Sequence, residues 1–140
     1  MSDKKIYQEE LMDHFKYPRN KYKIEDPDFY SGQFNPSCGD KISIEGKIEE
    51  DENGILRVTQ IGFDGSGCVI SMAAASMLTE KCLNKSVDEI LDLDKDDMLK
   101  LVGLNLGPIR LRCVLLCLEA LKQGLIEYKN KFVGMTRSKS

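Results

Sequence analysis

Hydrophobic residues over 5–16 recur at intervals of three to five positions, which predicts an amphipathic helix. Pro18 cannot continue such a helix, so we expect it to end there. Residues 17–37 show no periodicity and contain three prolines, which is typical of a long connection. One short strand is predicted near 30–36. The apolar positions of the first helix are Ile6, Tyr7, Leu11, Met12 and Phe15.

Alternating apolar and polar residues begin at Asp40 and predict a strand with one buried face. A second strand is predicted over 55–64. The two are separated by an acidic stretch that ends in Asn53-Gly54, a strong signal for a hairpin turn. We expect Ile42, Ile44 and Ile48 on one face of the first strand. In the second, we expect Leu56 and Val58 on one face and Ile61 and Phe63 on the other.

Helices are predicted for most of the chain after residue 65. Gly65-Ser66-Gly67 interrupts the strand, and small and apolar residues then predict a helix over 69–83. A capping box over 86–89 starts a short helix, because its serine and glutamate each satisfy a free amide. Two further helices are predicted over 94–101 and 109–123, the latter after Pro108. Gly124 either caps this last helix or lies within it.

The order of helix, strands and helices predicts an α+β fold: a small antiparallel sheet of about three strands with helices on one face. A chain of 140 residues suits one domain, 1–140. The net charge of −3 argues against a nucleic-acid binder. No apolar run reaches the ~20 residues that span a bilayer, and residues 1–5 do not lead into a signal peptide. We therefore expect a cytoplasmic protein with no membrane contact.

Three cysteines lie at predicted junctions between elements: Cys38, Cys68 and Cys113. In an extended segment, Cys38 and Asp40 point to the same side across Gly39, which lets the backbone pass close to an ion. Cys68 lies at a helix start, where an anion is favoured. Arg110 and Arg112 flank Cys113 and would offset excess negative charge. The five cysteines contain no Cys-x-x-Cys pair, which excludes a zinc ribbon and disfavours a thiol–disulfide enzyme. Spacing alone leaves open a shared metal site, a sulfur site or simple packing.

Several segments resemble the U-type iron–sulfur scaffold family, which comprises IscU, SufU and the N-terminal domain of NifU. They occur in the family's order over roughly residues 6–130. The matching segments are Tyr7, Met12-Asp13-His14-Phe15, Tyr17-Pro18-Arg19-Asn20, Pro36-Ser37-Cys38-Gly39-Asp40, Gly65-Ser66-Gly67-Cys68-Val69-Ile70-Ser71 and Leu106-Gly107-Pro108-Ile109-Arg110-Leu111-Arg112-Cys113.

The resemblance implies a surface site built from Cys38, Asp40, Cys68 and Cys113. Such a site binds zinc or assembles a [2Fe–2S] cluster with sulfur from a cysteine desulfurase, and passes the cluster to recipient apoproteins. Thiolates suit iron and zinc, while the harder carboxylate oxygen should bind a cluster less tightly and so favour its transfer. We expect Cys113 to accept the persulfide sulfur, because an exposed position at a helix start and flanking arginines favour a reactive thiolate.

Two segments depart from the IscU pattern. Arg112 stands where IscU-type members have a histidine, and a guanidinium cannot ligate a metal. In this respect the chain resembles SufU, a zinc-dependent sulfurtransferase, although it lacks the insertion typical of SufU. The scaffold function and the sulfurtransferase function therefore both remain as hypotheses, and a structural zinc domain is the third. Gly107 and Arg110 depart from the segment that a chaperone reads in IscU, so no chaperone contact is predicted.

Other residues that attract attention are expected to have structural roles. Cys82 and Cys117 match no ligand motif and are predicted to pack in the core. His14 is expected to be a hydrogen-bonded helix residue rather than a ligand. Met72 and Met77 are predicted core residues.

Overall fold

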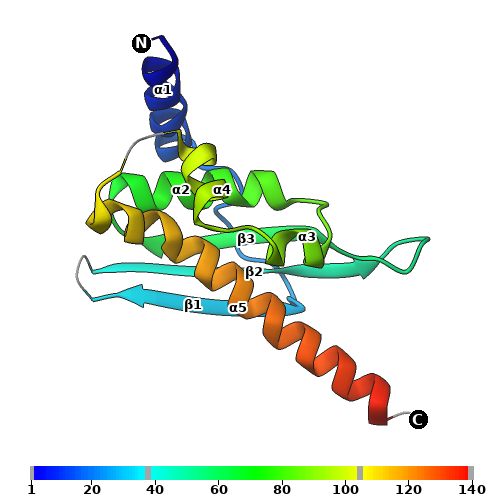
Figure 1. Ribbon diagram of the computed structural model, residues 1–140. Coiled ribbons are helices and arrows are strands. Elements are labelled where there is room, and N and C mark those ends of the chain that lie inside the picture. Colours follow the sequence, from blue (N-terminus) through cyan, green and yellow to red (C-terminus); the bar gives the residue numbers. More distant parts are fainter. Residues whose placement is uncertain (1, 37–38, 104–105, 139–140) are drawn as a thin grey trace.

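A three-stranded antiparallel sheet forms the frame on which the helices pack (Figure 1). The computed structural model describes residues 2–36, 39–103 and 106–138, and only the backbone of 2–7 and 133–138. The predicted α+β fold with about three strands is confirmed. In chain order the elements are α1 (Ser2–Lys16), β1 (Phe29–Asn35), β2 (Asp40–Glu50), β3 (Leu56–Ser66), α2 (Val69–Cys82), α3 (Val87–Leu91), α4 (Lys95–Val102) and α5 (Pro108–Ser138).

The sheet order is β1-β2-β3, so β2 is the central strand. Helix α5 packs on β1 and β2, α2 packs on β3 and α5, and α1 lies against α2 (Figure 1). The inward residues of β2 are the predicted isoleucines, each of which is at most 7% exposed. Because α2 and α5 cover this apolar face side by side, the chain segments that begin both helices meet at one end of the sheet.

A β-bulge in β3 corrects one prediction about this strand. Lys47 pairs with Gln60 but Ile48 pairs with Val58, which leaves Thr59 as an extra residue. An extra residue shifts the alternation by one position, so side chains on both sides of the bulge turn to the same face. Val58, Ile61 and Phe63 are all at most 1% exposed. The expectation that they occupy opposite faces is wrong because strict alternation does not hold across the bulge.

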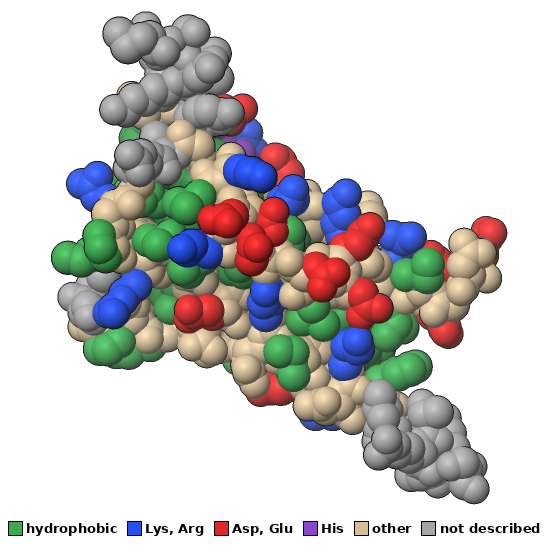
Figure 2. Space-filling model, viewed as in Figure 1, with side chains coloured by type: hydrophobic (Ala, Val, Ile, Leu, Met, Phe, Trp, Pro, Cys, Tyr) green, Lys and Arg blue, Asp and Glu red, His purple; other side chains and the backbone are tan. Residues whose placement is uncertain are grey.

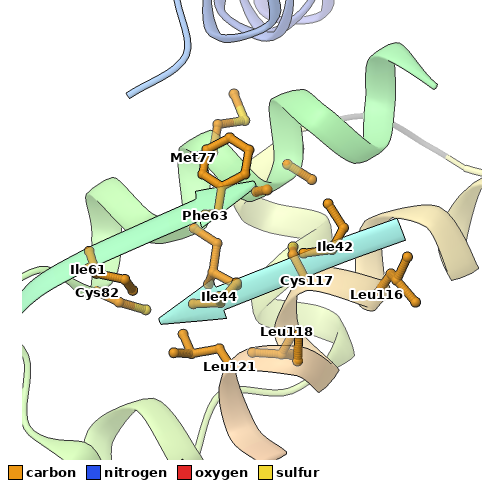
Figure 3. Packing of buried hydrophobic residues seen from close by; sticks show 14 of the residues in the cluster. Ile42, Ile44, Ile61, Phe63, Met77, Cys82, Leu116, Cys117, Leu118 and Leu121 are labelled. Atoms are coloured by element: carbon orange, nitrogen blue, oxygen red, sulfur yellow. The ribbon is translucent and has the colours of Figure 1, made fainter. Parts of the chain in front are cut away.

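The core lies between the sheet and helices α2 and α5. Ile44 and Phe63 pair across β2 and β3, and in Figure 3 their side chains lie between those of α2 and α5, with Met77 on one side and Leu121 on the other. Cys82 and Cys117 are both fully buried in this cluster, as predicted. Burial raises the pKa of each thiol to about 12, so both remain neutral packing residues at physiological pH.

The helix boundaries follow the capping signals of the sequence. Ser86 and Asp94 each form a capping box, at the starts of α3 and α4. Helix α5 runs through Gly124 instead of ending there. A Cβ at Gly124 would lie 3.0 Å from Cδ2 of Phe29, so this glycine permits the close approach of α5 to β1.

The connection after α1 is fixed to α2 by buried polar contacts. The Nδ1 atom of His14 lies 2.7 Å from Oγ of Ser76, and the amide of Arg19 donates to the same oxygen. His14 is 8% exposed, which confirms it as a hydrogen-bonded helix residue. Within the part of the chain that is described, no helix combines the length and apolar character needed to cross a bilayer.

Candidate functional site

Three of the four predicted ligands converge at the end of the sheet where α2 and α5 begin. Asp40 is the first residue of β2, Cys68 directly precedes α2, and Cys113 lies in the second turn of α5. One ligand atom from each lies within 4.8 Å of the others. The fourth, Cys38, lies outside the described residues. Chain segments 28 and 45 residues apart therefore supply one oxygen and two sulfurs to a common point.

Asp40 is 1% exposed, and both of its carboxylate oxygens have donors. The hydroxyl of Ser71 donates to Oδ2 at 2.6 Å, and the amide of Cys68 donates to Oδ1 at 3.1 Å. Burial alone would raise the pKa of the Asp40 carboxyl. Hydrogen bonds from Ser71, Cys113 and Cys68 outweigh that effect and hold the pKa below its usual value. Asp40 is therefore an ionised, fixed oxygen donor at neutral pH.

Among the three described site residues, Cys68 is the exposed one, and it caps helix α2. Its backbone is extended, and its Sγ accepts the amide of Ser71 at a distance of 3.4 Å. The sulfur thus occupies the position that a serine or aspartate oxygen takes in most helix caps. The helix start that the sequence predicted for Cys68 is confirmed.

Cys113 is 4% exposed, so the exposed position expected for it is wrong. Helix α5 begins at Pro108, which places Cys113 on the side of the helix that packs toward α2 and β2. The backbone carbonyl of Cys113 lies 3.3 Å from the Ser71 hydroxyl. Arg110 and Arg112 are both exposed on the same helical turns. In this structure, Cys68 is thus more open to solvent than Cys113.

Two glycines allow the backbone to build the site. A Cβ at Gly67 would lie 2.5 Å from Oδ1 of Asp40, so only glycine leaves room for the buried carboxylate. Gly39 has a φ of +73°, which an L-residue rarely adopts. A Cβ at Gly39 would meet nothing within 4 Å. Glycine is therefore needed at position 39 for the backbone conformation that leads into β2, not for space around its Cα atom.

Ser71 and Gly67 are site residues that the sequence predictions missed. Both belong to the segment that resembles the second cysteine loop of the U-type family. Ser71 follows Cys68 by three residues, which is the spacing of a capping residue and the amide it binds. That spacing predicts a contact between the two residues, but it does not reveal that the Ser71 side chain reaches Asp40.

The donor set fits a soft divalent metal or an iron–sulfur cargo. Thiolates with one carboxylate are ligands that zinc accepts, at about 2.3 Å from sulfur and about 2.1 Å from oxygen. Tetrahedral angles then place ligand sulfur and oxygen roughly 3.6 Å apart. Sγ of Cys68 and Oδ2 of Asp40 are 3.7 Å apart. The pair already has a suitable separation, and the Sγ atom of Cys113 lies within 4.8 Å of a ligand atom of each.

The surface around the site differs in side-chain type from the rest of the face that Figure 2 shows. Figure 2 shows hydrophobic and basic side chains at the end of the molecule where α5 begins. Acidic side chains gather over α3 and α4 instead. Ile109 is 71% exposed and, with Arg110 and Arg112, gives the neighbourhood of the thiols an apolar and basic character.

Known proteins resemble this chain over nearly its whole length. Residues 6–134 match the family of the NifU-like N-terminal domain. The iron–sulfur cluster assembly scaffold protein IscU 1 of Archaeoglobus fulgidus is 32% identical over 126 residues, covering 90% of this chain and 78% of that protein. The zinc-dependent sulfurtransferase SufU of Bacillus subtilis is 33% identical over 137 residues, covering 86% of this chain and 89% of that protein.

A solved structure shows the same fold. A crystal structure described as that of a hypothetical protein superimposes with a TM-score of 0.73 and 29% identity, covering 86% of this chain and 97% of that one. The family model spans every described residue of the candidate site, and both relatives exceed 30% identity over most of their length. The chain therefore belongs to the U-type family defined by the NifU-like N-terminal domain.

Proposed function

We propose that this chain is an iron–sulfur cluster assembly scaffold. It receives sulfur from a cysteine desulfurase, combines it with iron, and passes a [2Fe–2S] cluster to recipient apoproteins. The observation that carries the proposal is the convergence of Asp40, Cys68 and Cys113 within 4.8 Å at one end of the sheet. Family membership supports it, because IscU 1 of Archaeoglobus fulgidus is named as such a scaffold.

Cys38, Asp40, Cys68 and Cys113 are the proposed ligands. A [2Fe–2S] cluster takes four ligands, commonly thiolates. Here Asp40 replaces one thiolate with a harder oxygen, which binds such a cargo less tightly. The exposed Cys68 leaves one side of the site open to solvent. A mixed and partly open ligand set suits a cluster that must be released again.

The sulfur step is proposed to take place on Cys113. Its thiolate attacks the outer sulfur of the desulfurase persulfide. The sulfur–sulfur bond on the desulfurase breaks, its cysteine leaves as a thiolate, and the new persulfide forms on Cys113 without net oxidation. Later release of this sulfur as sulfide consumes two electrons from an external reductant. Arg110 and Arg112 lie on the same helical turns and offset the negative charge of the transferring group.

Exposure favours Cys68 as the competing acceptor, since Cys113 is only 4% exposed. Desulfurase loaded with ³⁵S-labelled cysteine distinguishes them in a single turnover. We expect the label on the peptide that contains Cys113, with loss of labelling in Cys113→Ser and retention in Cys68→Ser. Label confined to Cys68 would assign the acceptor role to Cys68 instead.

A zinc-dependent sulfurtransferase is the second candidate function, because Arg112 stands in place of the IscU-type histidine. The Bacillus subtilis relative bears that function in its name. In this reading, the same four residues would hold zinc, which would mask the thiols until the desulfurase docks. A structural zinc domain is a third reading, and it predicts that removing the metal unfolds the protein.

Anaerobic reconstitution with Fe²⁺ and sulfide separates these functions. A scaffold develops the visible absorption of a [2Fe–2S] cluster at near-stoichiometric occupancy and delivers it to an apo-ferredoxin. Cys82→Ala is the matched control, because that thiol is buried away from the site and its loss should leave occupancy unchanged. Retained zinc with strong stimulation of the desulfurase and no cluster would refute the scaffold function in favour of the sulfurtransferase.

A further inference from the structure

The hydroxyl of Ser71 lies at the point where the three described ligand segments meet. Ser71 is fully buried in the first turn of α2. Its Oγ is 2.6 Å from Oδ2 of Asp40, 3.3 Å from the carbonyl oxygen of Cys113 and 3.5 Å from Sγ of Cys68. One small side chain therefore contacts a residue from each of β2, α5 and the start of α2.

The single hydroxyl proton of Ser71 is assigned to Asp40 by distance and charge. A hydroxyl has one proton to donate, and an ionised carboxylate is a stronger acceptor than a backbone carbonyl. Hydrogen bonds between a hydroxyl and a carboxylate have typical lengths of about 2.5–2.7 Å, and the bond to Asp40 falls in this range. The contacts of the Ser71 hydroxyl with Cys113 and Cys68 are longer, so its proton is donated to Asp40 rather than to either of them.

This hydrogen bond holds the oxygen of Asp40 that faces the thiols. Oδ2 accepts from Ser71 and is also the oxygen 3.7 Å from Sγ of Cys68. Oδ1 is occupied on the other side by the amide of Cys68. The thiols of Cys68 and Cys113 also donate to this carboxylate while they are protonated. Thiols must lose their protons to bind a metal, so the Ser71 hydroxyl and the Cys68 amide are then the donors that fix the plane of the carboxylate. Without the hydroxyl, the amide alone would hold the ionised site and the carboxylate would be able to turn about its Cβ–Cγ bond.

We propose that Ser71 is a positioning residue for metal capture: it orients Asp40 toward Cys68 and Cys113 and acts only through that carboxylate. The inference rests on the proposed function, because it requires that these residues bind a metal. Partners that hydrogen-bond a ligating side chain commonly change metal affinity by about 10- to 100-fold when they are removed. Ser71 therefore contributes to metal retention without contacting the metal itself.

The test measures Co²⁺ and Zn²⁺ affinity of the full chain, with Co²⁺ as the spectroscopic probe. Thiolate-to-cobalt charge transfer and the visible bands of tetrahedral Co²⁺ report the ligand geometry directly. For Ser71→Ala we expect about 10- to 100-fold weaker binding and altered visible bands. Ser76→Ala is the matched control, because Ser76 is a buried serine of the same helix that bonds His14 and Arg19 instead. Its affinity should equal that of the wild type.

A double-mutant cycle with Asp40→Ala separates positioning from a general effect on the fold. If Ser71 acts through Asp40, then Ser71→Ala causes no further loss of affinity once the carboxylate is gone. This comparison remains available even if Ser71→Ala alone unfolds, because the double variant removes the buried carboxylate together with its donor. Equal affinities of Asp40→Ala and the double variant support the proposal, and a further tenfold loss overturns it.

Three other results would count against the inference in distinguishable ways. If the wild type binds Co²⁺ but Ser71→Ala binds it equally well, the positioning role is refuted while the metal site stands. If the wild type binds no Co²⁺ or Zn²⁺ through its thiols, both the site and the role of Ser71 are refuted. A lower melting temperature of metal-free Ser71→Ala with unchanged metal affinity would show a purely structural serine.

Discussion

Replacing Gly67 by alanine should displace the buried carboxylate of Asp40. The new Cβ would lie 2.5 Å from Oδ1, 2.8 Å from Cγ and 3.1 Å from Cβ of Asp40. Ordinary van der Waals contact needs roughly 3.5 Å or more. The carboxylate must therefore shift by about 1 Å, and it must give up or stretch its 3.1 Å bond from the Cys68 amide.

Overpacking of this kind costs about 1–3 kcal/mol, and the weakened hydrogen bond to a charged group argues for the upper half of that range. We expect Gly67→Ala to lower the free energy of unfolding of the metal-free protein by about 2 kcal/mol. For a chain of this size, that corresponds to a decrease of roughly 6–10 °C in melting temperature. Zinc affinity should fall at least about tenfold, because a ligand oxygen is displaced.

Thermal unfolding followed by circular dichroism and competition with a chelator measure the two effects. Gly107→Ala is the matched control, since it makes the same substitution where a Cβ would meet no atom within 4 Å. Gly107→Ala should melt within about 2 °C of the wild type. Equal behaviour of the two variants, in either stability or zinc binding, would refute the steric role assigned to Gly67.

Three further predictions concern the other titratable groups. Native protein treated with iodoacetamide at pH 8 should be alkylated at Cys68 but not at Cys82 or Cys117. The two buried thiols have a pKa of about 12, so only about one part in 10⁴ of each is thiolate at that pH. Peptide mass spectrometry that finds either buried thiol alkylated before denaturation would contradict this prediction. Burial raises the pKa of Cys82, so its stabilising contribution is present below pH 9 and is lost as the pH rises toward 12. Between pH 8 and pH 10, the free energy of unfolding of Cys82→Ala should therefore fall by roughly 1 kcal/mol less than that of the wild type. Identical alkaline losses of both proteins in urea titrations would count against this prediction. Burial lowers the pKa of His14, so the unfolded chain takes up a proton before the folded one and wild-type stability should fall as the pH drops below 6.5. The stability of His14→Gln should depend less steeply on pH in this range. An equally steep decline in the variant would assign the acid sensitivity to other groups.

Local signals in the sequence predicted most of the fold because they match the structure residue by residue. Alternation from Asp40 onward predicted the central strand, and the capping box at Ser86 predicted the start of α3. The helix predicted over 94–101 corresponds to α4. The long helix at the end of the chain was harder to delimit. Gly124 has low helix propensity, but its lack of a side chain lets α5 contact Phe29. A glycine needed for a tertiary contact looks the same in the sequence as one that ends a helix.

The bulge at Thr59 could not be predicted for a related reason. An extra residue in β3 reverses the inward and outward positions, and this becomes visible only when the register with β2 is known. The apolar residues on both sides of the bulge were recognised, but their common face was not. Pairing partners are non-local information that alternation within one strand does not contain.

The candidate site was predictable in its ligand types but not in its arrangement. Asp40, Cys68 and Cys113 were identified from motifs, and the structure brings these three together. The burial of Cys113 was missed because it depends on which side of α5 faces α2, a matter of packing. Ser71 was missed because its partner, Asp40, lies 31 residues away. Hydrogen-bond partners so distant in the chain require the folded structure.

The cap that Cys68 places on α2 has a consequence for anything this sulfur carries. The amide of Ser71 donates to Sγ of Cys68 over a distance of 3.4 Å. Hydrogen bonds to ligand sulfur withdraw electron density and are among the factors that set the reduction potential of iron–sulfur centres. If Cys68 binds the proposed cluster, the hydrogen bond that begins helix α2 would also help to set the reduction potential of that cluster.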